Sequence, residues 1–177
     1  VDWFALVGEN IKSVLAADGS FFLNIKEHSE DGERNLYVKD LVLAHKRAWG
    51  WRFVDEFCWR NTANGVPGRW PNRLKNAWEP VFHFCRNREI KFRPQNAGHL
   101  SEDVVVYAPG NPSAPSGSGL LGCGAKKTTG IAWPSNVVEV KAEGSQGSHS
   151  APFPRALVEF FVKAFSDPGD AVFDPFL

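Results

Sequence analysis

The sequence has no methionine, only three cysteines and no net charge over its 177 residues. The cysteines Cys58, Cys85 and Cys123 are widely spaced and form no Cys-x-x-Cys pair. This spacing argues against a disulfide framework and a zinc site, and it favours a reducing, cytoplasmic location. No cluster of His, Cys and Asp has metal-ligand spacing, so no metal is expected. No apolar run approaches the roughly 20 residues that span a bilayer, and the first residues show no signal-peptide pattern, so no membrane partner is expected.

The composition is that of an ordered globular chain of about one domain. Hydrophobic residues make up 43% and charged residues 23%, which excludes an intrinsically disordered protein. The charge is unevenly spread, because residues 46–93 carry a net +7 while the flanking segments are acidic. The same segment holds five of the seven tryptophans. Basic charge interleaved with aromatic and asparagine side chains indicates nucleic-acid contact, and a solvated basic face over a tryptophan-rich core is the alternative.

Hydrophobic periodicity predicts alternating helices and strands. Helices are expected at 2–17, about 35–49 and about 154–166, and strands at 20–25, 51–60, 79–86 and 171–173. This alternation predicts an α/β sheet with parallel strands. The loop from Asn61 to Trp78 is too long for a tight turn, and loops of this length are often functional. Residues 94–150 are poorly patterned, but no domain boundary is expected within them.

Three blocks of the sequence together resemble the DNA amino-methyltransferases, which methylate adenine N6 or cytosine N4. The C-terminal block runs from Phe153-Pro154, through Ser166-Asp167-Pro168-Gly169-Asp170, to Val172-Phe173-Asp174-Pro175-Phe176. It is similar to the cofactor-binding end of that family, where an apolar strand leads into Asp-Pro-Phe. Residues 1–22 resemble the helix and strand that follow the family's catalytic motif. Trp59-Arg60-Asn61 and 76–84 resemble the segment leading into target recognition. In this chain the catalytic end precedes the cofactor-binding end, which is the order of the family's beta class.

The resemblance implies an α/β fold with a Rossmann-like methyltransferase sheet and helices on both faces. It implies one catalytic domain, residues 1–177, with a loop-rich target-recognition insertion at about 95–148. The implied cofactor is S-adenosyl-L-methionine, the implied partner is double-stranded DNA, and a homodimer is compatible with the family. The implied reaction moves a methyl group to an exocyclic amine of a flipped base.

The resemblance also implies a cofactor site around the last helix. Its residues are His149, Ser150, Ala151, Phe153, Pro154, Phe173, Asp174, Pro175 and Phe176. Because the chain should reverse after the helix, we expect Phe153 and Asp174–Phe176 to lie together near the helix amino end, which suits a cofactor carboxylate. The alternatives are a proline-fixed helix entry with Phe153 as a hydrophobic staple, and an ordinary turn or cap role for Asp174.

The basic middle segment supplies the expected DNA contacts. They are Arg60, Asn61, Arg69, Trp70, Asn72, Arg73 and Lys75. Arginine can bridge guanine O6 and N7, and asparagine can pair with adenine N6 and N7. For each residue singly, a phosphate contact or a role in solubility is the alternative.

Two family motifs are not in the sequence. The catalytic tetrapeptide (Asp, Asn or Ser, then Pro-Pro and an aromatic residue) would precede Val1, and the glycine-rich turn would follow Leu177. No catalytic residue can therefore be named, and we expect the 177-residue chain to be a fragment that is inactive by itself. A truncated relative that only binds DNA is the alternative function. A nicotinamide dehydrogenase is disfavoured because no Gly-x-Gly-x-x-Gly follows a strand.

Overall fold

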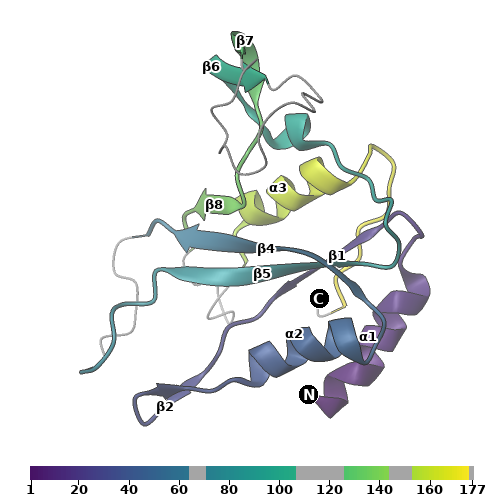
Figure 1. Cartoon of the computed structure of the whole chain (residues 1–177), viewed down its shortest axis with the longest axis vertical. Coiled ribbons are helices and arrows are strands. Elements are labelled where there is room, and N and C mark those ends of the chain that lie inside the picture. The colour runs from purple at the N-terminus through teal and green to yellow at the C-terminus, as the bar shows by residue number, and fades with distance from the viewer. Residues whose placement is uncertain (64–70, 107–125, 144–152, 176–177) are drawn as a thin grey trace, which may run out of the picture.

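A four-stranded sheet with helices on both faces forms the body of the computed structural model, which describes residues 1–63, 71–106, 126–143 and 153–175 (Figure 1). Its strands are β1 (Ser20–Asn24), β4 (Arg52–Asn61), β5 (Trp78–Cys85) and β8 (Val137–Val140), in the order β1-β5-β4-β8. The helices are α1 (Asp2–Val14), α2 (Tyr37–Arg47) and α3 (Arg155–Phe165), with a short 3-10 helix η1 (Pro94–Ala97). The three predicted helices and the first three predicted strands are thereby confirmed.

The helices form where apolar residues recur at helical spacing. In α1 the buried residues Phe4, Gly8 and Ile11 lie four and three positions apart, so they share one face. The helix stops at Val14, three residues before the predicted end, because Leu15 is extended and the N–H of Gly19 bonds the carbonyl of Ala16 in a turn. In α3 the buried residues Leu157, Phe161 and Ala164 repeat the same spacing.

The strand directions differ from the predicted parallel sheet. The central strand β5 runs antiparallel to both β1 and β4, and only β4 and β8 pair in parallel. The physical reason lies in the connections. A helix links β1 to β4, and these two strands do run in the same direction, as the alternation predicted. However, β5 returns through the segment after Asn61 and inserts between them, so the parallel strands are not neighbours.

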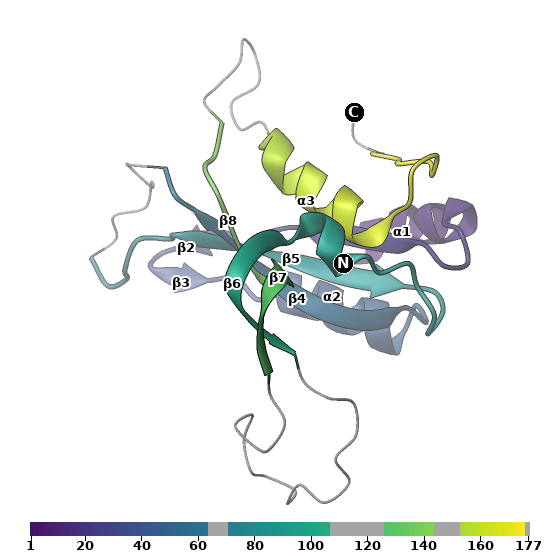
Figure 2. The same ribbon diagram turned by 90° about the horizontal axis from the view of Figure 1, so that it is seen from above.

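Two apolar layers cover the two faces of the sheet. Side chains of α1 and α2 pack with Phe82 and Phe84 of β5 on one face. Leu157 and Phe161 of α3 pack with Phe57, Trp59 and Val81 on the other face. Figure 2 shows α3 on the opposite side of the sheet from α2. Because β5 is buried on both faces, it reads as a nearly continuous apolar run.

The region 95–148, predicted as a loop-rich insertion, holds more regular structure than its sequence suggests. Strands β6 (His99–Val106) and β7 (Lys126–Ala132) form an antiparallel pair that projects from the body beyond α3 (Figure 1). Strand β8 belongs to the main sheet, where Val137 pairs with Cys58. A second small hairpin, β2 (Ser29–Glu30) and β3 (Glu33–Arg34), lies between β1 and α2. Part of the predicted insertion therefore completes the core sheet.

The predicted strand at 171–173 is wrong for the described chain. Residues 171–173 are not in a strand, and the side chains of Val172 and Phe173 are 65% and 68% exposed. An apolar run becomes a strand only when it pairs with the edge of another strand. The described sheet ends at β1 and β8, and 171–173 pairs with neither edge.

Candidate cofactor site and nucleic-acid interface

The amino end of α3 is fixed against the sheet by an aromatic contact. The ring of Phe153 stacks on Trp59 of β4, with centroids 6.1 Å apart and planes inclined by 24°. The indole Nε1 of Trp59 donates to the carbonyl of Val140 in β8, 3.0 Å away. Pro154, the residue before α3, is buried, while Phe153 keeps half of its surface exposed. Phe153 therefore contacts the sheet through Trp59 while half of its surface stays exposed, and its role as a hydrophobic staple stays a prediction.

A carboxylate already occupies the first free N–H of α3. The backbone N–H of Arg155 donates to Oε1 of Glu143, 2.9 Å away. The unpaired N–H groups and the partial positive charge of a helix amino end favour a negative group at this place. A cofactor carboxylate is expected at this place from the sequence, and this stays a prediction. Sequence reasoning missed Glu143, which lies 12 residues before Arg155.

The segment after α3 leads toward the predicted cofactor residues Asp174 and Pro175. The chain turns back after α3 on the same side of the sheet as that helix (Figure 2). Asp167 and Asp170 in this turn are bound by Arg93 and Lys91. The two aspartates were named from the sequence only as part of the C-terminal block, and neither Arg93 nor Lys91 was singled out. Their pairing partners are 74 to 79 positions apart, so no local spacing could have indicated them.

Part of the predicted cofactor set lies outside the described residues. This applies to His149, Ser150, Ala151 and Phe176. Of the rest, Phe153 and Pro154 lie at the amino end of α3, and Phe173, Asp174 and Pro175 lie in the exposed segment that follows the turn. The joint placement of Phe153 with Asp174–Phe176 stays a prediction.

The predicted DNA contacts are not all open to a ligand. Arg60 pairs with Glu139 at 2.6 Å. The side-chain oxygen of Asn61 accepts the backbone N–H of Ala63 at 2.9 Å and that of Ala142 at 3.0 Å. The first of these bonds is an Asx turn, which the position of Asn61 at the end of a strand could have indicated. Asn61 is therefore tied into the fold and shapes the loop that follows β4.

Asn72 and Arg73 bind the β2–β3 hairpin. The amide of Asn72 donates to the carbonyl of Gly32 at 2.9 Å, and a guanidinium N–H of Arg73 donates to Ser29 Oγ at 2.9 Å. Gly32 has a φ of +81°, and a Cβ there would lie 2.8 Å from the Asn72 amide nitrogen, so this approach requires glycine. Lys75 is exposed, while Arg69 and Trp70 lie outside the described residues.

The same hairpin carries acidic side chains. A cleft between the hairpin and the start of the 71–76 segment is lined by His28, Ser29, Glu30, Asp31, Gly32, Pro71 and Asn72. The negative charge of Glu30 and Asp31 disfavours a phosphate in this cleft. A DNA contact by the basic segment is therefore expected on its outer surface, where Lys75 is exposed.

Two classes of site are not found in the part of the chain that the structure describes. No three side chains of His, Cys, Asp or Glu in the described ranges are placed to hold a metal ion. None of the helices described is long and apolar enough to cross a membrane.

Comparisons with known proteins agree on one family. The model of a DNA methylase family (N6_N4_Mtase) matches residues 1–177. The Type II methyltransferase M.PvuII of Proteus hauseri is 24% identical over 204 residues, which cover 99% of this chain and 60% of that protein. The solved structure of PvuII DNA methyltransferase (cytosine-N4-specific) matches 96% of this chain and 55% of its own, with a TM-score of 0.68 and 21% identity. The chain thus spans about three fifths of the curated relative's length.

Proposed function

Because the chain belongs to the DNA methylase family, whose model covers residues 1–177, we propose that it is part of the catalytic domain of an S-adenosylmethionine-dependent DNA amino-methyltransferase. The reaction transfers a methyl group to adenine N6 or cytosine N4 in duplex DNA, in the setting of site-specific DNA methylation and restriction–modification. The match of the family model over the whole chain carries this proposal. The proposal extends to the fold, in which the α/β body of the chain is the Rossmann-like sheet of a single domain. Residues at about 95–148 form the target-recognition region in this proposal, and the proposed location is the cytoplasm.

The residues at the ends of α3 fit this cofactor chemically. The backbone N–H of Arg155 donates to the Glu143 carboxylate, so the amino end of α3 binds a negative group. S-adenosylmethionine carries a carboxylate on its methionine arm, which would take the place of Glu143 there. The half-exposed ring of Phe153 offers an apolar face to the same molecule. When bound, the cofactor supplies a methyl group made electrophilic by its sulfonium. In this proposal α3 orients the cofactor, Asp174 accepts hydrogen bonds from it, and Phe153 excludes water from its apolar part.

The proposed function is tested by methyl transfer. The longest natural protein that contains this chain should move tritiated methyl from S-adenosylmethionine to mixed-sequence duplex DNA. Mass spectrometry of the digested nucleosides then separates N6-methyladenine from N4-methylcytosine. The structural relative is named cytosine-N4-specific, so N4-methylcytosine is the first product to seek. S-adenosylmethionine binding and DNA binding with no methylated nucleoside would favour the truncated DNA-binding relative instead.

Asp174→Ala should weaken S-adenosylmethionine binding about tenfold or more, because a hydrogen bond to a charged group contributes about 1.5–3 kcal/mol. Calorimetric titration of the longest natural form measures this affinity. Glu89→Ala is the matched control, since Glu89 is an exposed carboxylate in the segment after β5. Equal affinities in the wild type and Asp174→Ala would remove Asp174 from the site.

Removing Arg69 and Arg73 together should weaken DNA binding and flatten its salt dependence. Each lost phosphate contact lowers the log–log slope by about 0.9, so the double variant should lose about 1.8. Filter-binding titrations across a salt series measure the slope. Because Arg73 also binds Ser29, Ser29→Ala serves as the control for a disturbed hairpin. An unchanged slope in the double variant would place the DNA contacts elsewhere.

A further inference from the structure

The segment that leaves β5 binds the turn between α1 and β1. The side-chain amide of Asn87 donates to the carbonyl of Ala17 at 2.7 Å, and the backbone N–H of Lys91 donates to the carbonyl of Asp18 at 3.1 Å. Arg86 adds a third bond, to the carbonyl of Leu15 at 2.8 Å. The three accepting residues follow Val14, the last residue of α1, so these donors bind the turn itself. The α1–β1 turn is therefore held from one side by residues 86–91.

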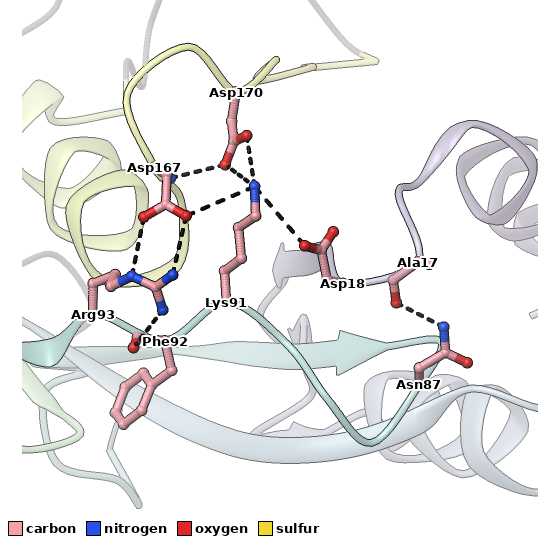
Figure 3. A network of polar contacts seen from close by, with 8 residues as sticks. All are labelled: Ala17, Asp18, Asn87, Lys91, Phe92, Arg93, Asp167 and Asp170. Atoms are coloured by element: carbon pink, nitrogen blue, oxygen red, sulfur yellow. Dashed lines mark hydrogen bonds and ion pairs between the residues drawn. The ribbon is translucent and has the colours of Figure 1, made fainter.

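The same segment binds the turn that follows α3, as Figure 3 shows. The Lys91 ammonium lies 2.7 Å from both carboxylate oxygens of Asp170, and 3.8 Å and 3.9 Å from Asp167 and Asp18. The Arg93 guanidinium pairs with both oxygens of Asp167 at 3.0 Å and 3.1 Å. Planar two-point pairing of this kind fixes direction as well as distance.

The turn that follows α3 is also closed by hydrogen bonds between its own residues. The N–H of Asp167 donates to the Asp170 carboxylate at 2.8 Å, and the N–H of Asp170 donates to the carbonyl of Asp167 at 3.1 Å. Hydrogen bonding to Asp170 raises the pKa of Lys91, and the Lys91 ammonium lowers the pKa of Asp170. Both groups therefore remain charged at neutral pH, and the turn is a closed unit fastened to residues 91–93.

This fastening limits where the predicted cofactor residues can lie. Asp174 follows Asp170 by four residues, which can span at most about 14 Å when fully extended. Residues 171–173 lie between them and are exposed. The position of Asp170 is therefore the centre of the region, about 14 Å in radius, that Asp174 can reach from this turn.

We propose that Lys91, supported by Arg93, is a positioning residue for the cofactor site. It holds the segment leading to Asp174 in a fixed relation to the α1–β1 turn, which joins the N-terminal helix to the sheet. The inference rests on the proposed function, since it takes S-adenosylmethionine as the ligand that Asp174 meets. Lys91 acts through Asp170 and has no contact with the cofactor in this scheme.

The test uses Lys91→Met, which keeps the length of the side chain and removes its charge. Two measurements are made on the longest natural form: amide hydrogen exchange at 167–174, and S-adenosylmethionine affinity by calorimetry. We expect exchange in this turn to accelerate at least tenfold and the dissociation constant to rise about tenfold, at an unchanged circular dichroism spectrum. Lys91→Arg should restore both values to within about threefold, because a guanidinium can still pair with Asp170.

Lys163→Met is the matched control. Lys163 pairs with Glu159 at 3.6 Å within α3 and joins no separate segments, so both measurements should stay at the wild-type value. Unchanged exchange in Lys91→Met would overturn the positioning role, and so would faster exchange with unchanged cofactor affinity. If the wild type binds no S-adenosylmethionine, both the proposed function and this inference fail. The exchange result by itself then shows only whether Lys91 fastens the turn.

Discussion

Acidification from pH 6.5 to pH 4 should lower the free energy of unfolding by about 3 kcal/mol through His83 alone. Burial lowers the pKa of His83 from 6.5 to about 4. Below pH 6.5 the unfolded chain binds a proton at this imidazole and the folded chain does not. Stability therefore falls by about 1.4 kcal/mol per pH unit until the folded pKa is reached, and it is unaffected above pH 6.5.

The surroundings of His83 explain why the neutral form is kept. The side chain is fully buried on β5, stacked on Phe22 with centroids 4.4 Å apart and edge-on to Phe165 at 4.7 Å. Nε2 contacts Ser20 Oγ at 2.9 Å, and Nδ1 has no hydrogen-bond partner among the described residues. A charged imidazolium here would have neither water nor a carboxylate in contact with it.

Denaturant unfolding at half-unit pH steps measures this loss. His83→Phe should flatten the dependence of the unfolding free energy on pH between pH 6.5 and 5. A smaller slope should remain from His45, because burial also lowers the pKa of that histidine. His99→Asn is the control variant, because it removes an exposed imidazole and leaves the buried His83 in place. A slope in His83→Phe equal to that of the wild type would contradict the assignment to His83.

Phe84→Ala should cost about 4 kcal/mol in the free energy of unfolding at neutral pH. Phe84 is fully buried near the C-terminal end of β5, where its ring centroid lies 4.6 Å from that of His45 and 5.6 Å from that of Phe53. Removing a buried phenyl ring loses its transfer free energy and leaves a cavity between the sheet and α2 that the packed neighbours fill only in part. Urea denaturation followed by tryptophan fluorescence measures the loss.

Phe173→Ala is the matched comparison for Phe84→Ala. The side chain of Phe173 is 68% exposed, so its truncation should change stability by no more than about 0.5 kcal/mol. The sequence predicts a buried strand at this position, and the structure places the residue in solvent. A loss of several kcal/mol in Phe173→Ala would support the sequence prediction over the structure.

The sequence was sufficient for features that depend on neighbouring residues. The helix over Arg155–Phe165 followed from apolar residues three and four positions apart, and β5 followed from its nearly continuous apolar run. The family followed from the order of three short blocks, and the family model agrees with it. The cofactor residues, in contrast, came from the family resemblance, and the DNA contacts came from the basic charge of the middle segment. The hydrogen bonds of Asn61, Asn72 and Arg73 show that polar side chains chosen in this way can be bonded within the fold.

Local pattern alone determined the three helices and the strands β1, β4 and β5, because 3.6-residue and 2-residue periodicities are properties of the chain itself. Tertiary structure decided which segments meet. It inserted β5 between β1 and β4, left 171–173 outside the sheet, and brought Lys91 to Asp170 across 79 positions. These outcomes depend on which strand edges and charges come together in space, and a pairing between distant residues leaves no periodic trace in one sequence.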